Sequence, residues 1–347
     1  MKRVSYTKIA EAAGVSVSTV SRVVNNAPGI SEQTRNHVLA VMQQLQYYPR
    51  QFAGGDHSRP SRLISLVITE LDENIFQNPF FIMAIKGANA CARERHYHVM
   101  VSFFRNGSEQ YEYLQELVSA NWTDGAVLFS VEREDPSIEL LLEQGFPFSV
   151  IGRPASSGEV LWTDNDNFQA MYRVVGELID HGHRRIAFLG GDWNKTYTLD
   201  RWEGYRAALR SRNIEENPAL SPKPPVGIAG EELGAEETGY RIMRRILQEE
   251  QPDAVTAADD FLAFGALRAL EEAGLQETAL VGYNNSVRGM FQRPSLSSVD
   301  IHPERLGYEA ARLLIDSLQD GPPQPAHQIV DASVVHRETS RFRGAVQ

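Results

Sequence analysis

The stretch that decides the fold is Ser5–Asn25, SYTKIAEAAGVSVSTVSRVVN. Ser5 is a good N-cap for a first short helix, and Ser16 is a good N-cap for a second one. Gly14 lies between them, where a left-handed residue ends a helix without steric cost. The stretch therefore predicts two short helices joined by a tight turn, the pattern of a helix-turn-helix.

Apolar residues recur at helical spacing in both halves of this stretch. In the first helix, Ile9 and Ala12 are expected to form the buried face, to which Ala10 and Ala13 can add. The second helix carries a valine stripe, made of Val20, Val23 and Val24. A third helix is expected at 31–45, so that three helices would share one small core.

The polar side of the second helix suits the major groove of DNA. A forked arginine can pair with guanine, and small hydroxyl residues and backbone N–H groups can hold phosphates. The candidates for contact with base edges are Val17, Ser18 and Arg22. The candidates for phosphate contact are Ser16, Thr19, Ser21 and Asn25. On spacing alone, an ordinary helical hairpin remains an alternative.

The run AGVSxxTVSRVVN resembles the headpiece of the lac repressor and galactose repressor family, and Tyr47-Tyr48-Pro49 matches the place where that headpiece ends. The resemblance implies a transcriptional regulator, most like the maltose-operon repressors, that forms a homodimer. Each headpiece would read one half of a near-palindromic operator in double-stranded DNA. No heptad tail follows, so a dimer is expected rather than a tetramer.

The linker at 50–61 departs from the family pattern. In the family this segment forms a hinge helix whose leucine enters the minor groove. Here the matching position holds Asp56, preceded by Gly54-Gly55, which disfavour a helix. Phe52, with its neighbour Ala53, is the substitute contact that we expect at the DNA.

Composition and charge agree with a small DNA-binding module on a large acidic body. The 347 residues carry a net charge of −11, yet residues 1–60 hold seven Lys/Arg and three Asp/Glu, which leaves −15 for the rest. The single cysteine, Cys91, excludes an internal disulfide and fits a reducing compartment. Neither a secretory leader nor a membrane span is expected, so the location expected is the cytoplasm, away from any membrane.

Beyond residue 62 the sequence alternates short apolar runs with helical stretches, and the alternation restarts near residue 186. This pattern predicts an α/β fold with two lobes, each a doubly wound parallel sheet. The body resembles the periplasmic-binding-protein-like fold that lac repressor family members use. The expected division is a helix-turn-helix headpiece at 1–49, a linker at 50–61, and a two-lobed effector-binding and dimerisation domain at 62–340.

Ligands of open α/β sheets bind at the carboxyl ends of the strands. Arg153, Asp164 and Trp193 follow predicted strands and could serve a sugar, since polar groups bind hydroxyls and an aromatic ring covers the apolar sugar face. For Trp193, core packing is an equal alternative. The resemblance adds further candidate effector contacts, namely Phe80, Phe81, Arg201, Asp259, Phe261 and Asn284. It also implies a small sugar as effector, maltose or a maltodextrin.

Other functional classes fit less well. The sequence contains no GxSxG, GxxxxGK[ST] or HExxH motif, and its close histidine pairs lack a third ligand at metal spacing, so neither an enzyme nor a metal or other cofactor is expected. A transport binding protein would not need the helix-turn-helix. Two alternatives remain within the family: a catabolite-control regulator that binds a phosphorylated phosphocarrier protein, and a regulator that responds to another sugar or a nucleobase.

Overall fold

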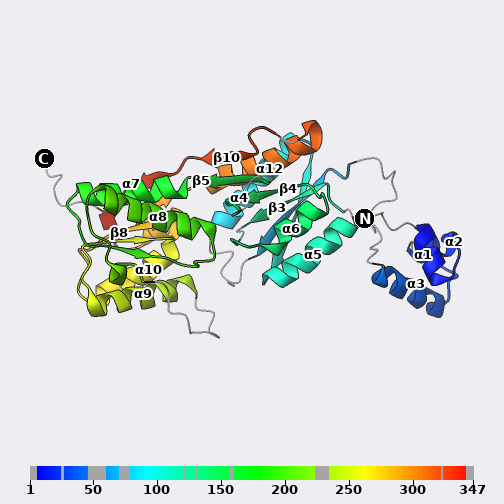
Figure 1. Ribbon diagram of the computed structural model, residues 1–347, viewed down its shortest axis with the longest axis horizontal. Helices are drawn as coiled ribbons and strands as arrows, with labels where there is room; N and C mark the ends of the chain where they lie inside the picture. The colour runs from blue at the N-terminus through cyan, green and yellow to red at the C-terminus, as the bar shows by residue number, and fades with distance from the viewer. Residues whose placement is uncertain are drawn as a thin grey trace.

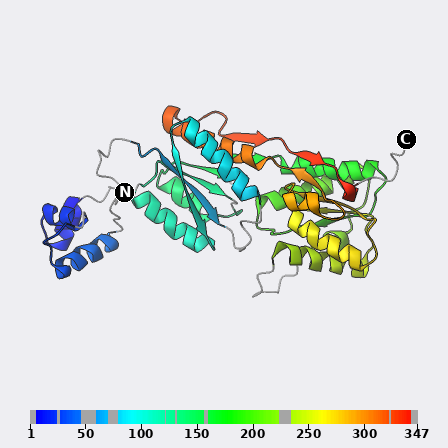
Figure 2. The same ribbon diagram turned by 180° about the vertical axis from the view of Figure 1, so that it is seen from behind.

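The computed structural model describes residues 6–24, 27–45, 60–69, 79–120, 122–129, 132–155, 160–222, 234–321 and 323–340. It has a small helical headpiece and a body of two lobes, each a twisted sheet between two layers of helices (Figure 1). The lobes follow one another along the length of the molecule, as the view from behind also shows (Figure 2). The α/β prediction is confirmed.

The headpiece consists of three helices, α1 (Tyr6–Ala13), α2 (Val17–Val24) and α3 (Glu32–Gln44). The chain turns between α1 and α2 at Gly14, which has a φ of 63°. The buried side chains of its core are Ile9, Ala10, Ala13, Val20, Val23, Val38, Val41 and Met42. Ala12 is exposed, so its predicted place in the core is wrong. Ala10 and Ala13, which share a helical face with Ile9, are the alanines that meet the other helices.

The first lobe comprises residues 63–165 and 303–330. Its six-stranded parallel sheet has the order β10-β5-β4-β3-β1-β2. The strands are β1 (Leu63–Thr69), β2 (His98–Phe104), β3 (Gly125–Phe129), β4 (Phe148–Ile151), β5 (Leu161–Asn165) and β10 (His327–Val330). One face is covered by α4 (Pro79–Glu94) and α12 (Pro303–Asp320), and the other by α5 (Gly107–Ala120) and α6 (Pro136–Glu143).

Helices α4 and α12 touch backbone to backbone through glycines. A Cβ atom added at Gly87 would lie 1.8 Å from the carbonyl oxygen of Glu304, and one added at Gly307 would lie 1.9 Å from that of Ala84. Both distances are far below van der Waals contact, so only glycine allows this approach. Within this pair, α12 packs on β3, β4, β5 and β10, and α4 packs on β2.

The second lobe comprises residues 167–300 and 333–340, with sheet order β11-β9-β8-β7-β6. The strands are β6 (Ile186–Leu189), β7 (Ala254–Ala257), β8 (Ala279–Tyr283), β9 (Ser297–Asp300) and β11 (Ser333–Val335), of which β11 is antiparallel to β9. Helices α9 (Ala235–Glu249) and α10 (Asp260–Glu272) cover one face, and α7 (Asn167–Asp180) and α8 (Thr196–Ser211) cover the other. The short α11 (Val287–Phe291) follows β8.

The chain crosses between the lobes three times, at 165–167, 300–303 and 330–333. Each lobe is therefore built from separate parts of the sequence, and any motion of one lobe against the other bends three segments together. No helix among the described residues combines the length and the apolar character that crossing a bilayer requires.

Candidate DNA interface and effector site

Helix α2 is N-capped by Ser16. The backbone N–H of Thr19 donates to Ser16 Oγ at 3.1 Å, and the hydroxyl oxygens of Ser18 and Thr19 each lie 2.8 Å from that same oxygen. Three hydroxyl groups therefore gather at the end of the helix where the backbone dipole is positive. Such an end suits a phosphate group.

The predicted base-edge residues lie on the exposed side of α2. Val17, Ser18 and Arg22 are exposed, whereas Thr19 and Ser21 are half-buried. Positions 17, 18, 21 and 22 share one side of the helix because one turn separates the two pairs. Helix α2 thus carries five of the candidates, four of them on one side, while Asn25, Phe52, Ala53 and the atypical run 54–56 lie outside the described residues.

The loop after α2 is tied to the headpiece by two arginines. Arg22 Nη2 donates to the carbonyl oxygen of Pro28 at 3.0 Å. Arg35 of α3 donates from Nη2 to the carbonyl oxygen of Ala27 at 3.1 Å. Sequence reasoning missed Arg35, whose Nη1 also donates to the carbonyl oxygen of Val23 at 3.5 Å and so joins α3 to α2.

Arg201 is the centre of the candidate effector site. It lies on α8 and is only 5% exposed. Its Nε donates to Asn167 Oδ1 at 2.9 Å, and Nη1 donates to the carbonyl oxygen of Ala258. The guanidinium carbon lies 3.5 Å from the ring centroid of Tyr283 and 4.7 Å from that of Tyr197. Aromatic faces and fixed acceptors therefore hold the cation in one orientation.

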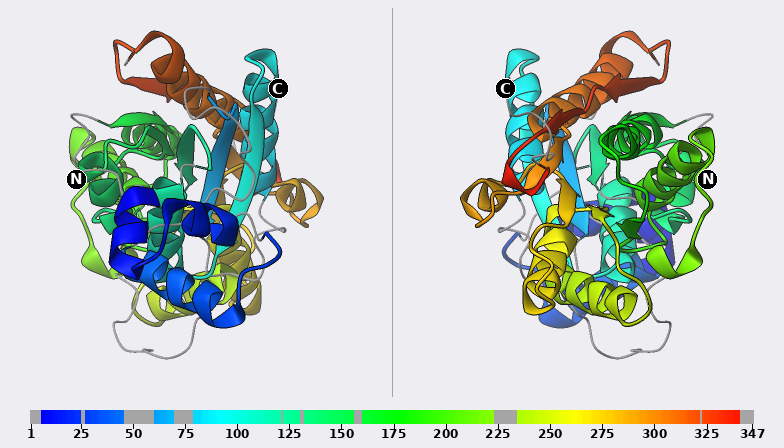
Figure 3. Two further views of the ribbon diagram at one scale, coloured as in Figure 1. Left: turned by 90° about the vertical axis from the view of Figure 1, so that its right-hand side faces the viewer. Right: turned by 90° about the vertical axis from the view of Figure 1, so that its left-hand side faces the viewer.

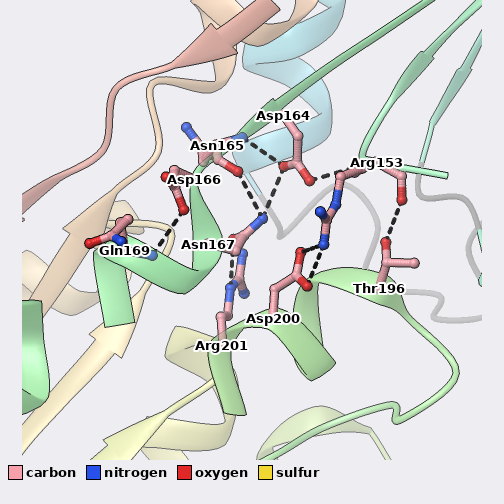
Figure 4. A network of polar contacts seen from close by, with 9 residues as sticks. All are labelled: Arg153, Asp164, Asn165, Asp166, Asn167, Gln169, Thr196, Asp200 and Arg201. Carbon is pink, nitrogen blue, oxygen red and sulfur yellow. Dashed lines mark hydrogen bonds and ion pairs between the residues drawn. The ribbon is translucent and has the colours of Figure 1, made fainter. Parts of the chain in front are cut away.

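Asp164 is buried beside this arginine, at the end of β5 (Figure 4). Its carboxylate accepts hydrogen bonds from the backbone N–H of Arg153 at 3.1 Å, the backbone N–H of Asn165 at 2.7 Å, and Asn167 Nδ2 at 3.1 Å. Burial raises the pKa of Asp164 to about 6, although these donors and the Arg201 charge oppose the shift. The sequence predicts that Asp164 follows a strand, and this is wrong because β5 continues to Asn165 and contains Asp164.

Two neighbouring carboxylates at the start of α10 have different roles. Asp259 is the N-cap of α10, with Leu262 N–H donating to Oδ1 at 2.8 Å. Burial raises the pKa of Asp259, and the positive charge of Arg201 opposes this. Asp260 is turned into the lobe, where it accepts from Ser298 Oγ at 2.7 Å and from the Ser286 N–H at 2.6 Å. Asp260 therefore holds the loops of the sheet, and Asp259 is the carboxylate near Arg201.

Arg153 connects the two lobes (Figure 4). Its Nη2 lies 2.5 Å and 2.6 Å from the two carboxylate oxygens of Asp200 on α8, and its carbonyl oxygen accepts from Thr196 Oγ1 at 2.8 Å. A second contact joins the lobes nearby, where Glu132 and Lys195 form an isolated antiparallel β-bridge. The structure thus places the Arg153 side chain in a contact between lobes.

The predicted aromatic residues are divided between core and partly exposed positions. Phe81 is buried in the main hydrophobic core, and Phe80 packs against that core with its ring centroid 5.1 Å from that of Phe81. Trp193 is partly buried and meets Trp202 edge to face, with the ring centroids 5.4 Å apart. Phe261 is also partly buried. Phe80, Trp193 and Phe261 are therefore partly exposed residues, whereas Phe81 is almost fully buried.

Asn284 follows β8 in a left-handed conformation, with φ of 100°, and its backbone N–H donates to the carbonyl oxygen of Val299 at 2.9 Å.

Of the predicted effector residues, Arg201, Asp164 and Asp259 form one electrostatic group. Sequence reasoning missed Asn167 and Tyr283 as partners of Arg201, and the polar run TDNDN was the available signal for Asn167.

Comparison with known proteins places both parts of the chain. Residues 7–50 match the model of bacterial regulatory proteins of the lacI family, and residues 175–340 match a periplasmic binding protein-like domain. The transcriptional regulator CelR of Thermobifida fusca is 30% identical over 97% of this chain and 98% of its own length. MalR of Streptococcus pneumoniae is 30% identical over 91% of this chain and 93% of its own.

A solved structure described as a CelR–cellobiose complex has a TM-score of 0.74 and 29% identity, and the match covers 97% of this chain and 100% of that one. These relatives are transcriptional regulators and not enzymes. The helix-turn-helix, the two-lobed body and the full-length similarity agree: the chain belongs to the lacI family of bacterial regulatory proteins and is a DNA-binding transcriptional regulator.

Proposed function

We propose that this protein represses sugar-utilisation genes in the cytoplasm and that a small neutral sugar controls its affinity for DNA. The observation that carries the proposal is Arg201, a buried cation held between two tyrosine rings and close to two carboxylates, Asp164 and Asp259. Carboxylate oxygens accept from sugar hydroxyls, and a guanidinium donates to them. With the neighbouring pair of Arg153 and Asp200 included, two cations against three carboxylates disfavour an anionic ligand such as a sugar phosphate.

For the identity of the sugar, we propose a glucosyl disaccharide, with maltose or a maltodextrin first and cellobiose second. The similarity to MalR supports the former, and the similarity to CelR, which has been solved with cellobiose, supports the latter. Phe80, Trp193 and Phe261 are partly buried aromatic residues, and their rings would cover the sugar faces. Asn284 and a carboxylate oxygen of Asp164 would supply the other polar contacts to the sugar.

Calorimetric titration of the full chain with maltose, maltotriose and cellobiose tests this, with glucose 6-phosphate as the anionic control. Arg201→Ala should weaken sugar binding by about 10- to 100-fold, because a hydrogen bond from a charged group contributes about 1.5–3 kcal/mol. Arg210→Ala is the matched control, since Arg210 lies on the same helix but its side chain is exposed and pairs with Glu216. Binding of glucose 6-phosphate or a nucleobase, without binding of the neutral sugars, would favour a regulator of another ligand class. Binding of a phosphorylated phosphocarrier protein alone would favour a catabolite-control regulator.

For DNA, we propose that the headpiece at 1–49 reads the operator, the linker at 50–61 connects it, and the domain at 62–340 senses the effector. Base edges would be contacted by Arg22, Val17 and Ser18. Phosphates would be contacted by Ser16, Thr19, Ser21 and Asn25. In the linker, Phe52 and Ala53 would make the substitute contact with DNA. Selection of duplexes from a random library should yield a near-palindrome. Enrichment of no sequence would refute this part.

We also propose a homodimer, in which a second copy covers an apolar side of the body. Ile82 on α4 and Val287, Met290 and Phe291 on α11 are exposed, and Phe291 is 75% exposed. Both elements project from the same side of the body (Figure 3). Sedimentation of Phe291→Glu should show a monomer, whereas Leu142→Glu, at an exposed leucine of α6, should leave the dimer intact. A dimeric Phe291→Glu variant would refute this surface.

A further inference from the structure

Asn165 is the last residue of β5 and lies at the first of the three crossings between the lobes. Its side chain is 5% exposed. The amide nitrogen Nδ2 donates to the carbonyl oxygen of Ile301 at 3.1 Å and to that of Val330 at 2.8 Å. Ile301 belongs to the second crossing, and Val330 is the residue at which the third one begins. One side chain therefore joins all three crossings.

The chemistry of an amide suits this task. An Asn side chain carries two N–H donors on one nitrogen, so it can satisfy two carbonyl oxygens at once. Both carbonyls belong to segments that leave a sheet, where the regular ladder of hydrogen bonds ends. With Asn165 in place, the three segments keep a fixed spacing, and they must bend together when one lobe rotates against the other.

The same residue is directly connected to the candidate effector site. Its backbone N–H donates to Asp164 Oδ1 at 2.7 Å, and its carbonyl oxygen accepts from Asn167 Nδ2 at 3.3 Å. Asn167 Oδ1 in turn accepts from Arg201 Nε at 2.9 Å and from the hydroxyl of Tyr283 at 3.2 Å. A change in the position of Asp164 therefore reaches the crossings through Asn165, and a change in the position of Arg201 reaches them through Asn167 and Asn165.

We propose that Asn165 is a positioning residue that makes the three crossings act as one hinge and so transmits closure of the lobes to the headpiece side of the body. The transmission part rests on the proposed control by an effector. The hinge part does not, because it concerns only how the two lobes move. The experiment separates the two.

The first measurement is the distribution of distances between the lobes, in the full chain without DNA or sugar. Spin labels on Glu143→Cys in α6 and Glu271→Cys in α10, both exposed, report it by pulsed electron resonance in a Cys91→Ala background. Asn165→Ala should broaden the distribution. Asn165→Ser keeps a single donor, which can satisfy one of the two carbonyls, so it should broaden the distribution less. This variant also tests the hinge if the alanine variant does not fold.

Ser149→Ala is the matched control. Ser149 is fully buried in the first lobe and donates to the carbonyl oxygen of Ala310 at 2.8 Å, so its loss removes a similar bond away from the crossings. It should lower the melting temperature without broadening the distribution. If the Asn165 variants also lower only the melting temperature, Asn165 is an ordinary buried hydrogen-bonding residue and the proposal is overturned.

The second measurement is operator affinity with and without cellobiose or maltose. Coupling between two sites of this kind is typically about 5- to 150-fold, and for Asn165→Ser we expect it to fall below about 2-fold while sugar still binds. A broadened distribution with unchanged coupling would keep the hinge and overturn the transmission. Absence of any sugar response in the unaltered protein would count against the proposed effector and would leave the distance result as it stands.

Discussion

The ion pair between Arg153 and Asp200 predicts how firmly the two lobes are held together before any effector binds. The Arg153 side chain is 48% exposed and that of Asp200 is 23% exposed, so water screens part of their attraction. A close pair in such surroundings contributes about 1 kcal/mol, which corresponds to about a fivefold change in an equilibrium constant. We therefore expect Asp200→Asn to lower the ratio of closed to open lobes by about fivefold.

A double-mutant cycle on effector affinity measures this contribution. Arg153→Gln and Asp200→Asn should each weaken binding of the sugar that calorimetry identifies, and the double variant should weaken it no further, because the pair is lost only once. High salt should reduce the difference between the variants and the unaltered protein. Arg212→Gln is the matched control, since Arg212 pairs with Asp180 inside the second lobe and has no part in closure.

The cycle also distinguishes two roles of Arg153. If Arg153 binds the effector directly, as we expected from its position after β4, then Arg153→Gln will weaken binding equally in the presence and in the absence of the Asp200 carboxylate. Additive losses with no coupling between the two positions would therefore refute the reasoning from the ion pair.

Three further predictions follow from other parts of the molecule. Gly307→Val should lower the free energy of unfolding by more than about 3 kcal/mol, since its Cβ would overlap the Ala84 carbonyl oxygen in the pair of α4 and α12; Gly107→Ala, with open space around it, should have little effect in the same urea titration. Burial raises the pKa of Asp164 from 3.8 to about 6, so the fold favours the neutral carboxyl group. Protonated Asp164 therefore adds at most about 3 kcal/mol to the free energy of unfolding. This contribution is complete below the unfolded-state pKa and is lost as the pH rises through about 6. Urea titrations at several pH values should record that decline in the free energy of unfolding, and Asp164→Asn should flatten it. Arg22→Lys keeps the charge of the side chain but not its fork, so it should weaken binding to the selected operator by about 10-fold and leave the salt dependence unchanged; an equal loss on random DNA in a fluorescence titration would contradict a base contact.

The elements that were predicted from sequence have strong local patterns. The third helix of the headpiece, expected at 31–45, extends over Glu32–Gln44. Strands β9, β10 and β11 were not predicted. In β9, Ser297 and Ser298 are buried, and their polar groups are satisfied by distant partners such as Thr339 and Asp260, so the run resembles a loop in sequence. Strand β10 is at the edge of its sheet and is largely exposed.

The candidate site, too, could be predicted only where single residues stand out in the sequence. Arg201, Asp164 and Asp259 carry charges that stand out in sequence, and they come within electrostatic reach of one another. Their supporting contacts are long-range: Arg201 pairs with Asn167 across 34 positions, and Arg153 pairs with Asp200 across 47. No local pattern contains such pairings, because the first depends on how α7 and α8 pack within the second lobe and the second on how the crossings place one lobe against the other.

The described contacts separate the residues that set the balance between lobe arrangements from those that an effector would use to shift it. An effector changes an equilibrium only by its difference in affinity for the two arrangements. Arg153 with Asp200, and Thr196 with the Arg153 carbonyl group, join the two lobes and so stabilise the arrangement in which these groups meet. Because these contacts already contribute to closure, a sugar bound through Arg201 needs to add only a modest difference to reach a high closed fraction. Variants of the pair should therefore alter the response threshold, whereas variants of Arg201 should remove the response itself.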